Sequence, residues 1–252
     1  MSMARGHTTH RRRKGRFPVL LRLLCVALIV AAAIGATTLF FRIETILVEG
    51  NQRYAEQEII EAAGLRLGGN LYLMNKYDHA QAIFRDLPYV ESASINRKLP
   101  DTLVIEVREC TAAASVPAED GAWLMSLSGK LLEKSAAVPE GCIKVTGCSL
   151  FEPELSGEAA FDADSGYKMS ALRSLLRTAE EKRIRTNIRS VELGDDTCLQ
   201  FTYADRFSVK LPWTADIGYK LESLATVVDY LEENESGTIN LMTDGKASFI
   251  PE

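Results

Sequence analysis

The chain has 252 residues, of which 46% are hydrophobic and 25% are charged. This composition excludes a globally disordered chain and a polytopic membrane protein, and the 17 glycines and 8 prolines exclude a collagen-like or low-complexity chain. The net charge of -5 conceals an asymmetry, because residues 1–22 hold seven of the 29 basic residues and no acidic residue. The remainder therefore sets 22 basic residues against 34 acidic ones.

An apolar run separates the basic head from the acidic body. Residues 23–41 are 19 consecutive residues without a charge, and a helix of that length spans roughly 29 Å, about one hydrocarbon core. A single span must be helical, because only a helix satisfies all its backbone groups within one segment. Basic flanks stay cytoplasmic. The sequence therefore predicts a cytoplasmic tail at 1–22, a transmembrane helix in the lipid bilayer at 23–41, and a body outside the membrane at 42–252.

Two alternatives compete with this interpretation of the head. Ala31–Ala33 could serve as the cleavage site of a signal peptide, but the apolar run continues past these alanines to Phe41, which favours an uncleaved anchor. The basic cluster could also bind nucleic acid. Its position next to a span is better explained by topology and by anionic lipid, so we expect no nucleic-acid partner.

The cysteines fit this topology without proving it. Cys25 lies in the apolar run, whereas Cys110, Cys142, Cys148 and Cys198 lie in the part predicted to be outside, where disulfides can persist. Four cysteines allow three pairings, and the sequence does not choose among them. The absence of a Cys-x-x-Cys motif gives no support to a thioredoxin-like protein or a zinc ribbon.

Residues 42–109 carry the pattern of one small domain. Two-residue alternation predicts strands and 3.6-residue periodicity predicts helices. The resulting order is strand, helix, helix, strand, strand, at residues 42–49, 54–63, 78–87, 90–97 and 102–109. Two helices can cover one face of a three-stranded sheet, so the sequence predicts a two-layer α+β unit.

The motifs in this stretch resemble a POTRA domain. They are Ile-x-x-Ile-x-Val-x-Gly-Asn at 43–51, Gly-x-x-x-Gly-x-Asn-Leu at 64–71, Leu-Pro-Tyr-Val-Glu-x-Ala at 87–93, Arg-Lys-Leu-Pro-Asp-Thr-Leu at 97–103 and Ile-Glu-Val-x-Glu at 105–109. A cytoplasmic tail, one span, a POTRA domain at 42–109 and a β domain at 110–252 resemble the layout of the FtsQ/DivIB family of bacterial cell-division proteins. The resemblance implies an α+β fold whose β-α-α-β-β POTRA domain precedes a mixed β domain with two helices.

The predicted elements of residues 110–252 agree with such a β domain. The clearest helix is 216–234, whose apolar residues recur at steps of four and three. Asp244-Gly245 is the turn signal of a terminal hairpin. The elements expected are a hairpin at 122–133, a strand at 143–145, a helix at 167–182, strands at 188–193, 198–203 and 207–211, the helix at 216–234, and the hairpin at 237–250.

Catalytic and metal-binding motifs are missing from the sequence. His79 is the only imidazole in the part predicted to be outside, and its place near the start of a helix favours a solvated side chain. The sequence has no His-Glu-x-x-His, no zinc spacing of cysteine and histidine, no Walker lysine motif, and no Lys-Thr-Gly of the penicillin-binding class. We therefore expect no catalytic residue, no metal, no cofactor and no enzymatic activity.

Without catalysis, function must be recognition, and an unpaired strand edge can accept a strand from a partner. The family resemblance implies a divisome scaffold in the inner or plasma membrane at the septum. It would bind division proteins of the FtsB/DivIC and FtsL types and link them to septal cell-wall synthases. The implied binding residues are those of the last strand: Lys246, Ala247, Ser248, Phe249 and Ile250. Alternatively, the apolar pair among them closes the core.

A second class of function stays open at this point. POTRA domains also occur in components of envelope assembly and protein export, which bind extended polypeptides. Such proteins carry repeated POTRA modules or a barrel, whereas this sequence has one module and no series of amphipathic barrel strands.

Overall fold

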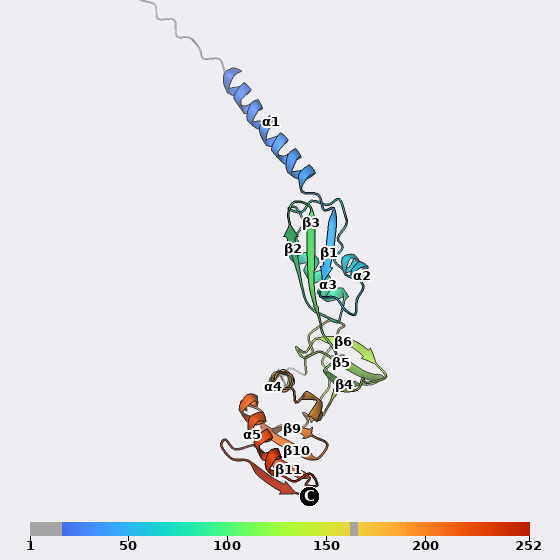
Figure 1. Cartoon of the computed structure of the whole chain (residues 1–252), viewed down its shortest axis with the longest axis vertical. Helices are drawn as coiled ribbons and strands as arrows, with labels where there is room; N and C mark the ends of the chain where they lie inside the picture. The colour runs from blue at the N-terminus through green and yellow to red at the C-terminus, as the bar shows by residue number, and fades with distance from the viewer. Residues whose placement is uncertain (1–16, 162–165) are drawn as a thin grey trace, which may run out of the picture.

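The structure, a computed structural model, describes residues 17–161 and 166–252. Helix α1 (Phe17–Phe40) precedes two folded units that follow one another along the chain (Figure 1). The side chains of α1 are described at residues 20–35 and at Phe40. Within the described residues, no helix is long and apolar enough to cross a bilayer. The transmembrane helix at 23–41 stays a prediction, and residues 1–16 of the basic tail lie outside the described part.

The first unit, residues 42–109, has the predicted order of strand, helix, helix, strand and strand. Its central strand is β3, which runs parallel to β1 and antiparallel to β2. Both helices share one apolar core with the sheet, so the predicted two-layer α+β unit is confirmed. The elements are β1 (Thr45–Glu49), α2 (Glu56–Ala62), α3 (Lys76–Asp86), β2 (Val90–Lys98) and β3 (Thr102–Glu109).

Local hydrogen bonds define where the helices of this unit begin. The carboxylate of Glu58 accepts the N–H of Ala55 at 2.8 Å, at the start of α2. The side chain of Asn75 accepts the N–H of Tyr77 at 3.2 Å, at the start of α3. These bonds satisfy donors that the first turn of a helix leaves free. The helices and the sheet then bury apolar side chains against one another. Those that are fully buried in this unit include Ile59, Leu71, Ile83, Leu103 and Ile105.

The second unit, residues 110–252, is built on a nine-stranded sheet with the order β12-β11-β10-β9-β8-β7-β4-β5-β6. Neighbouring strands are antiparallel except at β4–β7, β7–β8 and β10–β11, which are parallel. The strands are β4 (Ala114–Ala118), β5 (Gly121–Met125), β6 (Leu131–Ser135), β7 (Ile143–Thr146), β8 (Ile188–Glu192), β9 (Cys198–Tyr203), β10 (Phe207–Pro212), β11 (Gly237–Asn240) and β12 (Ser248–Pro251).

Helices α4 (Gly166–Glu181) and α5 (Ile217–Tyr230) pack against the same core of this sheet. A short 3-10 helix, η2 (Arg185–Asn187), follows α4. Strand β10 shows the resulting alternation, since Phe207 and Val209 are buried while Ser208 and Lys210 face the opposite side and are partly exposed. The second unit is therefore the expected mixed β domain with two helices, although α5 ends at Tyr230 and not at 234 as the sequence predicts.

Side chains at the junction link the two units. Lys130 is 2% exposed, and its Nζ donates to the carbonyl oxygens of Phe84 at 2.7 Å and Val90 at 2.8 Å. The hydroxyl of Tyr89 donates to Oε1 of Glu133 at 2.7 Å. Because Phe84 lies in the last turn of α3, the ammonium also meets the negative end of the helix dipole. The second unit thus holds the C-terminal end of a helix of the first.

Candidate partner-binding edge

Strand β12 forms one edge of the nine-stranded sheet, and β11 is its neighbour. The two strands pair in antiparallel register, with Ser248 opposite Asn240 and Ile250 opposite Thr238. The hairpin predicted at 237–250 is confirmed, but β12 begins at Ser248. Three of the five predicted binding residues therefore lie in the edge strand, and Lys246 and Ala247 lie in the connection that precedes it.

The two apolar residues of the edge face opposite sides of the sheet. The ring of Phe249 is partly buried and packs edge-to-face on Phe207, with 6.1 Å between the ring centroids. Ile250 is 58% exposed. Of the two alternatives for these residues, core closure describes Phe249, whereas Ile250 offers apolar surface on the face that the helices do not cover.

The backbone of β12 offers few free hydrogen-bonding groups. The N–H of Glu252 donates to the carbonyl of Ser236 at 3.0 Å, across the ladder. Because hydrogen-bonded pairs alternate in an antiparallel ladder, Ser248 and Ile250 also direct their N–H and C=O groups to β11. The N–H and C=O of Phe249 and the C=O of Pro251 then point away from the sheet. Pro251 has no N–H to offer.

A buried lysine of α5 holds the connection before this edge. Lys220 is 2% exposed, and its Nζ donates to the carbonyls of Leu241 at 2.7 Å and Thr243 at 3.3 Å. The same Nζ forms an ion pair with Oδ1 of Asp244 at 2.8 Å. Hydrogen bonds of this charge-assisted kind contribute about 1.5–3 kcal/mol each, and an unpaired buried ammonium would be costly.

Sequence reasoning missed Lys220, although a signal for it was present. It follows Ile217 by three positions and precedes Leu224 by four, which places it on the apolar stripe of the predicted helix. A lysine at such a position must find acceptors inside the fold. Beside it, a groove of about 220 Å³ runs between α5 and the connection, lined among others by Tyr219, Val227, Lys246 and Ala247.

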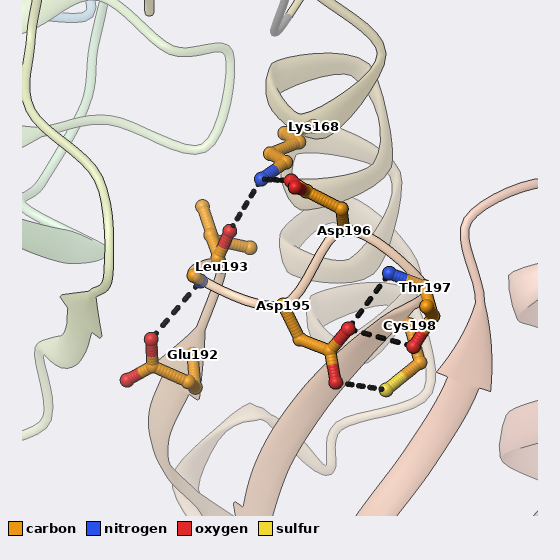
Figure 2. Close-up of polar contacts among 8 residues, drawn as sticks. Lys168, Glu192, Leu193, Asp195, Asp196, Thr197 and Cys198 are labelled. Atoms are coloured by element: carbon orange, nitrogen blue, oxygen red, sulfur yellow. Dashed lines mark hydrogen bonds and ion pairs between the residues drawn. The ribbon is translucent and has the colours of Figure 1, made fainter.

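A second buried lysine repeats this arrangement at the β8–β9 connection. Figure 2 shows Lys168 of α4, whose Nζ donates to the carbonyl of Leu193 at 2.9 Å and to Oδ1 of Asp196 at 2.8 Å. The bond to Asp196 raises the pKa of Lys168. In the same turn Asp195 accepts the N–H of Thr197 at 2.7 Å and its hydroxyl at 2.6 Å, and these bonds lower the pKa of Asp195. The carboxylates of this turn thus fix its shape.

His79 corrects an expectation from the sequence. It is not fully solvated: it is partly buried, and its Nδ1 lies 2.6 Å from the carbonyl oxygen of Ala63. Ala63 follows the last residue of α2, where helix carbonyls lack intrahelical partners. The imidazole therefore joins α3 to the end of α2 and serves the packing of the first unit.

The cysteines are thiols in the structure and are not paired with one another. Cys110, Cys142, Cys148 and Cys198 are all free. Burial raises the pKa of each of these four thiols, and it raises those of Cys110 and Cys148 to about 12. Within residues 17–161 and 166–252, no group of three or more histidine, cysteine or acidic side chains is arranged to hold a metal ion.

Comparison with known proteins finds one matching domain family and several related sequences. Residues 41–109 match the FtsQ-type POTRA domain family. The cell division protein DivIB of Clostridium botulinum (strain Loch Maree / Type A3) is 25% identical over 217 residues, which cover 84% of this chain and 83% of that protein. The cell division protein FtsQ of Corynebacterium glutamicum is 28% identical over 125 residues, which cover 48% of this chain and 55% of that protein.

One solved structure also aligns with the chain. It is the major extracytoplasmic domain of DivIB from Geobacillus stearothermophilus, with a TM-score of 0.32 and 14% identity over 50% of this chain and 97% of that one. The sequence relatives and the POTRA match carry more weight than this weak likeness. The chain thus has an FtsQ-type POTRA domain at residues 41–109 and is similar over most of its length to DivIB, a cell-division protein.

Proposed function

We propose that this protein is a non-enzymatic scaffold of the bacterial division septum. It binds other single-span division proteins, of the FtsB/DivIC and FtsL types, and links them to the synthases of septal peptidoglycan. The observation that carries the proposal is the uncovered edge strand β12 at the end of the β-domain sheet. The names of the relatives, which are cell division proteins, support the division context.

The membrane anchor belongs to this proposal. Helix α1 runs from Phe17 to Phe40, and its described large apolar side chains between Leu20 and Ile34 are 50–68% exposed. Exposed apolar surface of that extent calls for an apolar environment. With the basic residues of the tail at one end, the anchor would leave the N-terminus in the cytoplasm and the POTRA and β domains outside the membrane.

Strand addition at β12 is the binding mode that we assign to the partner. A strand laid against this edge would pair with the N–H and C=O of Phe249 and with the C=O of Pro251. Few backbone bonds are available, so side chains must supply much of the affinity. Ile250 is suited to that role, because it is exposed and adjacent to the edge.

The test is a charge placed at the exposed apolar position of the edge. Ile250→Lys should leave the fold intact, because the side chain is 58% exposed, and it should weaken binding of the DivIC-type partner at least tenfold, measured by titration calorimetry. Leu155→Lys is the matched control, since Leu155 is 57% exposed and lies in a turn far along the chain from β12. Phe249→Asp is a poorer test, because it would also remove the ring contact with Phe207.

If Ile250→Lys binds the partner as tightly as the wild type and Leu155→Lys do, this edge is not the binding surface.

An experiment in cells separates the proposed function from its alternative. Depletion of the protein should produce filaments without septa. Normal division combined with a secretion defect would instead favour a POTRA-bearing component of envelope assembly or export.

A further inference from the structure

Three lysines are buried among the described residues, and each one directs its ammonium to backbone carbonyls. Lys130 holds the end of α3, Lys168 holds the β8–β9 connection, and Lys220 holds the β11–β12 connection. The third differs in its location, because the connection that it holds leads directly into the proposed binding edge. The question is whether Lys220 merely supports the fold or sets the position of that edge.

The ammonium of Lys220 is fully used. An ammonium has three N–H donors and no acceptor. The structure gives it three acceptors: the carbonyls of Leu241 and Thr243 and the carboxylate of Asp244. All three residues lie in the first four positions of the seven-residue connection 241–247. One buried cation therefore holds the backbone at these positions as it leaves β11.

The remaining hydrogen bonds of the connection do not replace this clamp. The N–H of Met242 donates to Oδ1 of Asn240 at 2.9 Å, and the N–H of Lys246 donates to the carbonyl of Thr243 at 3.4 Å; both bonds are local to the hairpin. The N–H of Leu241 donates to the carbonyl of Lys210 in β10 at 3.0 Å, which holds only the first residue of the connection and does not reach α5. Within the described residues, the hydrogen bonds between the connection and α5 all come from the side chain of Lys220.

The edge strand itself has little else to hold it. β12 is four residues long, it has one neighbour, and Phe249 is its main contact with the core. Short edge strands with one neighbour open readily, because few contacts oppose local unfolding. A connection of fixed shape reduces the number of conformations that β12 can adopt when it is not paired, and this favours the paired state. It also keeps Ser248 opposite Asn240.

We propose that Lys220 is a positioning residue for partner binding. It clamps the β11–β12 connection to α5, so that β12 is already ordered and in register when a partner strand arrives. Lys220 itself need not touch the partner, because it is buried behind the connection. The part of this inference that concerns the partner rests on the proposed function, whereas the clamp is a property of the free protein.

The experiment compares Lys220→Met with Lys168→Met in the full chain in detergent micelles. Both variants remove a buried ammonium with carbonyl and carboxylate acceptors, but only the first touches the connection to β12. Amide hydrogen exchange of the free protein should become at least tenfold faster at Ser248 and Ile250 in Lys220→Met, with the amides of β9 unchanged. Affinity for the segment of the DivIC-type partner outside the membrane should fall about tenfold. Lys168→Met should change neither the exchange rates at Ser248 and Ile250 nor the affinity for the partner, even if it lowers the melting temperature as much as Lys220→Met does.

A second variant guards against global unfolding of Lys220→Met. Asp244→Ala removes one of the three acceptors at a side chain that is 92% exposed, so it should fold and should speed the same two amides by a smaller factor of two to five. Equal exchange at β12 in the wild type and in both clamp variants would overturn the inference. Faster exchange without any loss of affinity would also overturn it, because Lys220 would then be structural only. If the wild type does not bind the partner at all, the proposed function fails, and the exchange data still report on the clamp.

Discussion

The buried thiols illustrate how single residues depend on their surroundings. Burial raises the pKa of Cys110 to about 12, and the neighbouring carboxylate of Glu91 adds to the shift. Burial raises the pKa of Cys148 to about 12 as well, assisted by Glu192. Because the thiolate is the nucleophile, we expect both side chains to react slowly at neutral pH. The sequence could count the cysteines but could not say how each one is surrounded.

The first prediction concerns the reactivity of these two thiols. At pH 8 a thiol of pKa about 12 has a thiolate fraction on the order of 10³ smaller than that of an unperturbed cysteine. Alkylation of Cys110 and Cys148 by iodoacetamide in the folded protein should therefore be slower by about that factor than in urea, as followed by peptide mass spectrometry. Folded-state rates within tenfold of those in urea would show that the two sites are open.

At the scale of single elements, periodicity predicted most of the structure. The two helices and three strands of the POTRA domain follow from alternation and apolar stripes, and so does the terminal hairpin. Strand β4 was not predicted, because Ala114–Ala118 contains a proline and lacks a clear alternation of apolar and polar residues. The five residues proposed for binding came from a resemblance. Neighbouring residues of a strand face opposite sides, but the sequence could not tell which of Phe249 and Ile250 faces the core.

The order of strands in the sheet could not be read from the sequence. After β10 the chain passes through α5 and returns as β11, which lies beside β10 and parallel to it. Strand β12 then pairs with the outer side of β11 and so forms the edge of the sheet. Lys220 could have been identified from its place on the apolar stripe of the helix, but its acceptors come from residues 21 to 24 positions later. Such long-range partners are set by tertiary packing and not by local pattern.

The second prediction concerns the proline in the edge strand. Pro251 lies where an N–H would point away from the sheet, and prolines at such positions discourage unwanted strand pairing. Pro251→Ala should therefore increase concentration-dependent self-association, measured by sedimentation velocity. Pro212→Ala in β10 is the control, because β10 has a neighbour on each side. If the two variants are equally monomeric, Pro251 does not protect this edge.

At the scale of the whole molecule, the junction between the domains depends on Lys130. Burial lowers the pKa of this ammonium to about 8, while its neighbours Cys110 and Glu91 raise it. Three carbonyls of the POTRA domain, those of Phe84, Leu87 and Val90, accept from its Nζ. The ring of Phe84 also lies under the ammonium, with 3.6 Å from Nζ to the ring centroid. The charge state of one side chain thus bears on how the two domains are held together.

The third prediction follows from the lowered pKa of Lys130. Between pH 8 and about 10.5, the unfolded chain holds a proton on this lysine that the folded chain has released, so this group makes the free energy of unfolding rise with pH. Urea unfolding of the wild type and of Lys130→Met should show a difference that moves in favour of the wild type between pH 8 and 10. Because other groups titrate in both proteins, only the difference is informative. A difference that stays constant, or moves toward the variant, would mean that the three carbonyls keep the ammonium charged.

The central claim, that β12 receives a strand from a division partner, is tested most directly by residue-resolved amide exchange of the full chain with and without the DivIC-type partner. In the free protein the N–H of Phe249 points away from the sheet and should exchange fast. Binding should protect this amide at least tenfold and leave the edge strands β1 and β2 of the POTRA domain unchanged. A bound complex in which Phe249 still exchanges as in the free protein, or in which protection falls on the POTRA edges instead, would contradict the account.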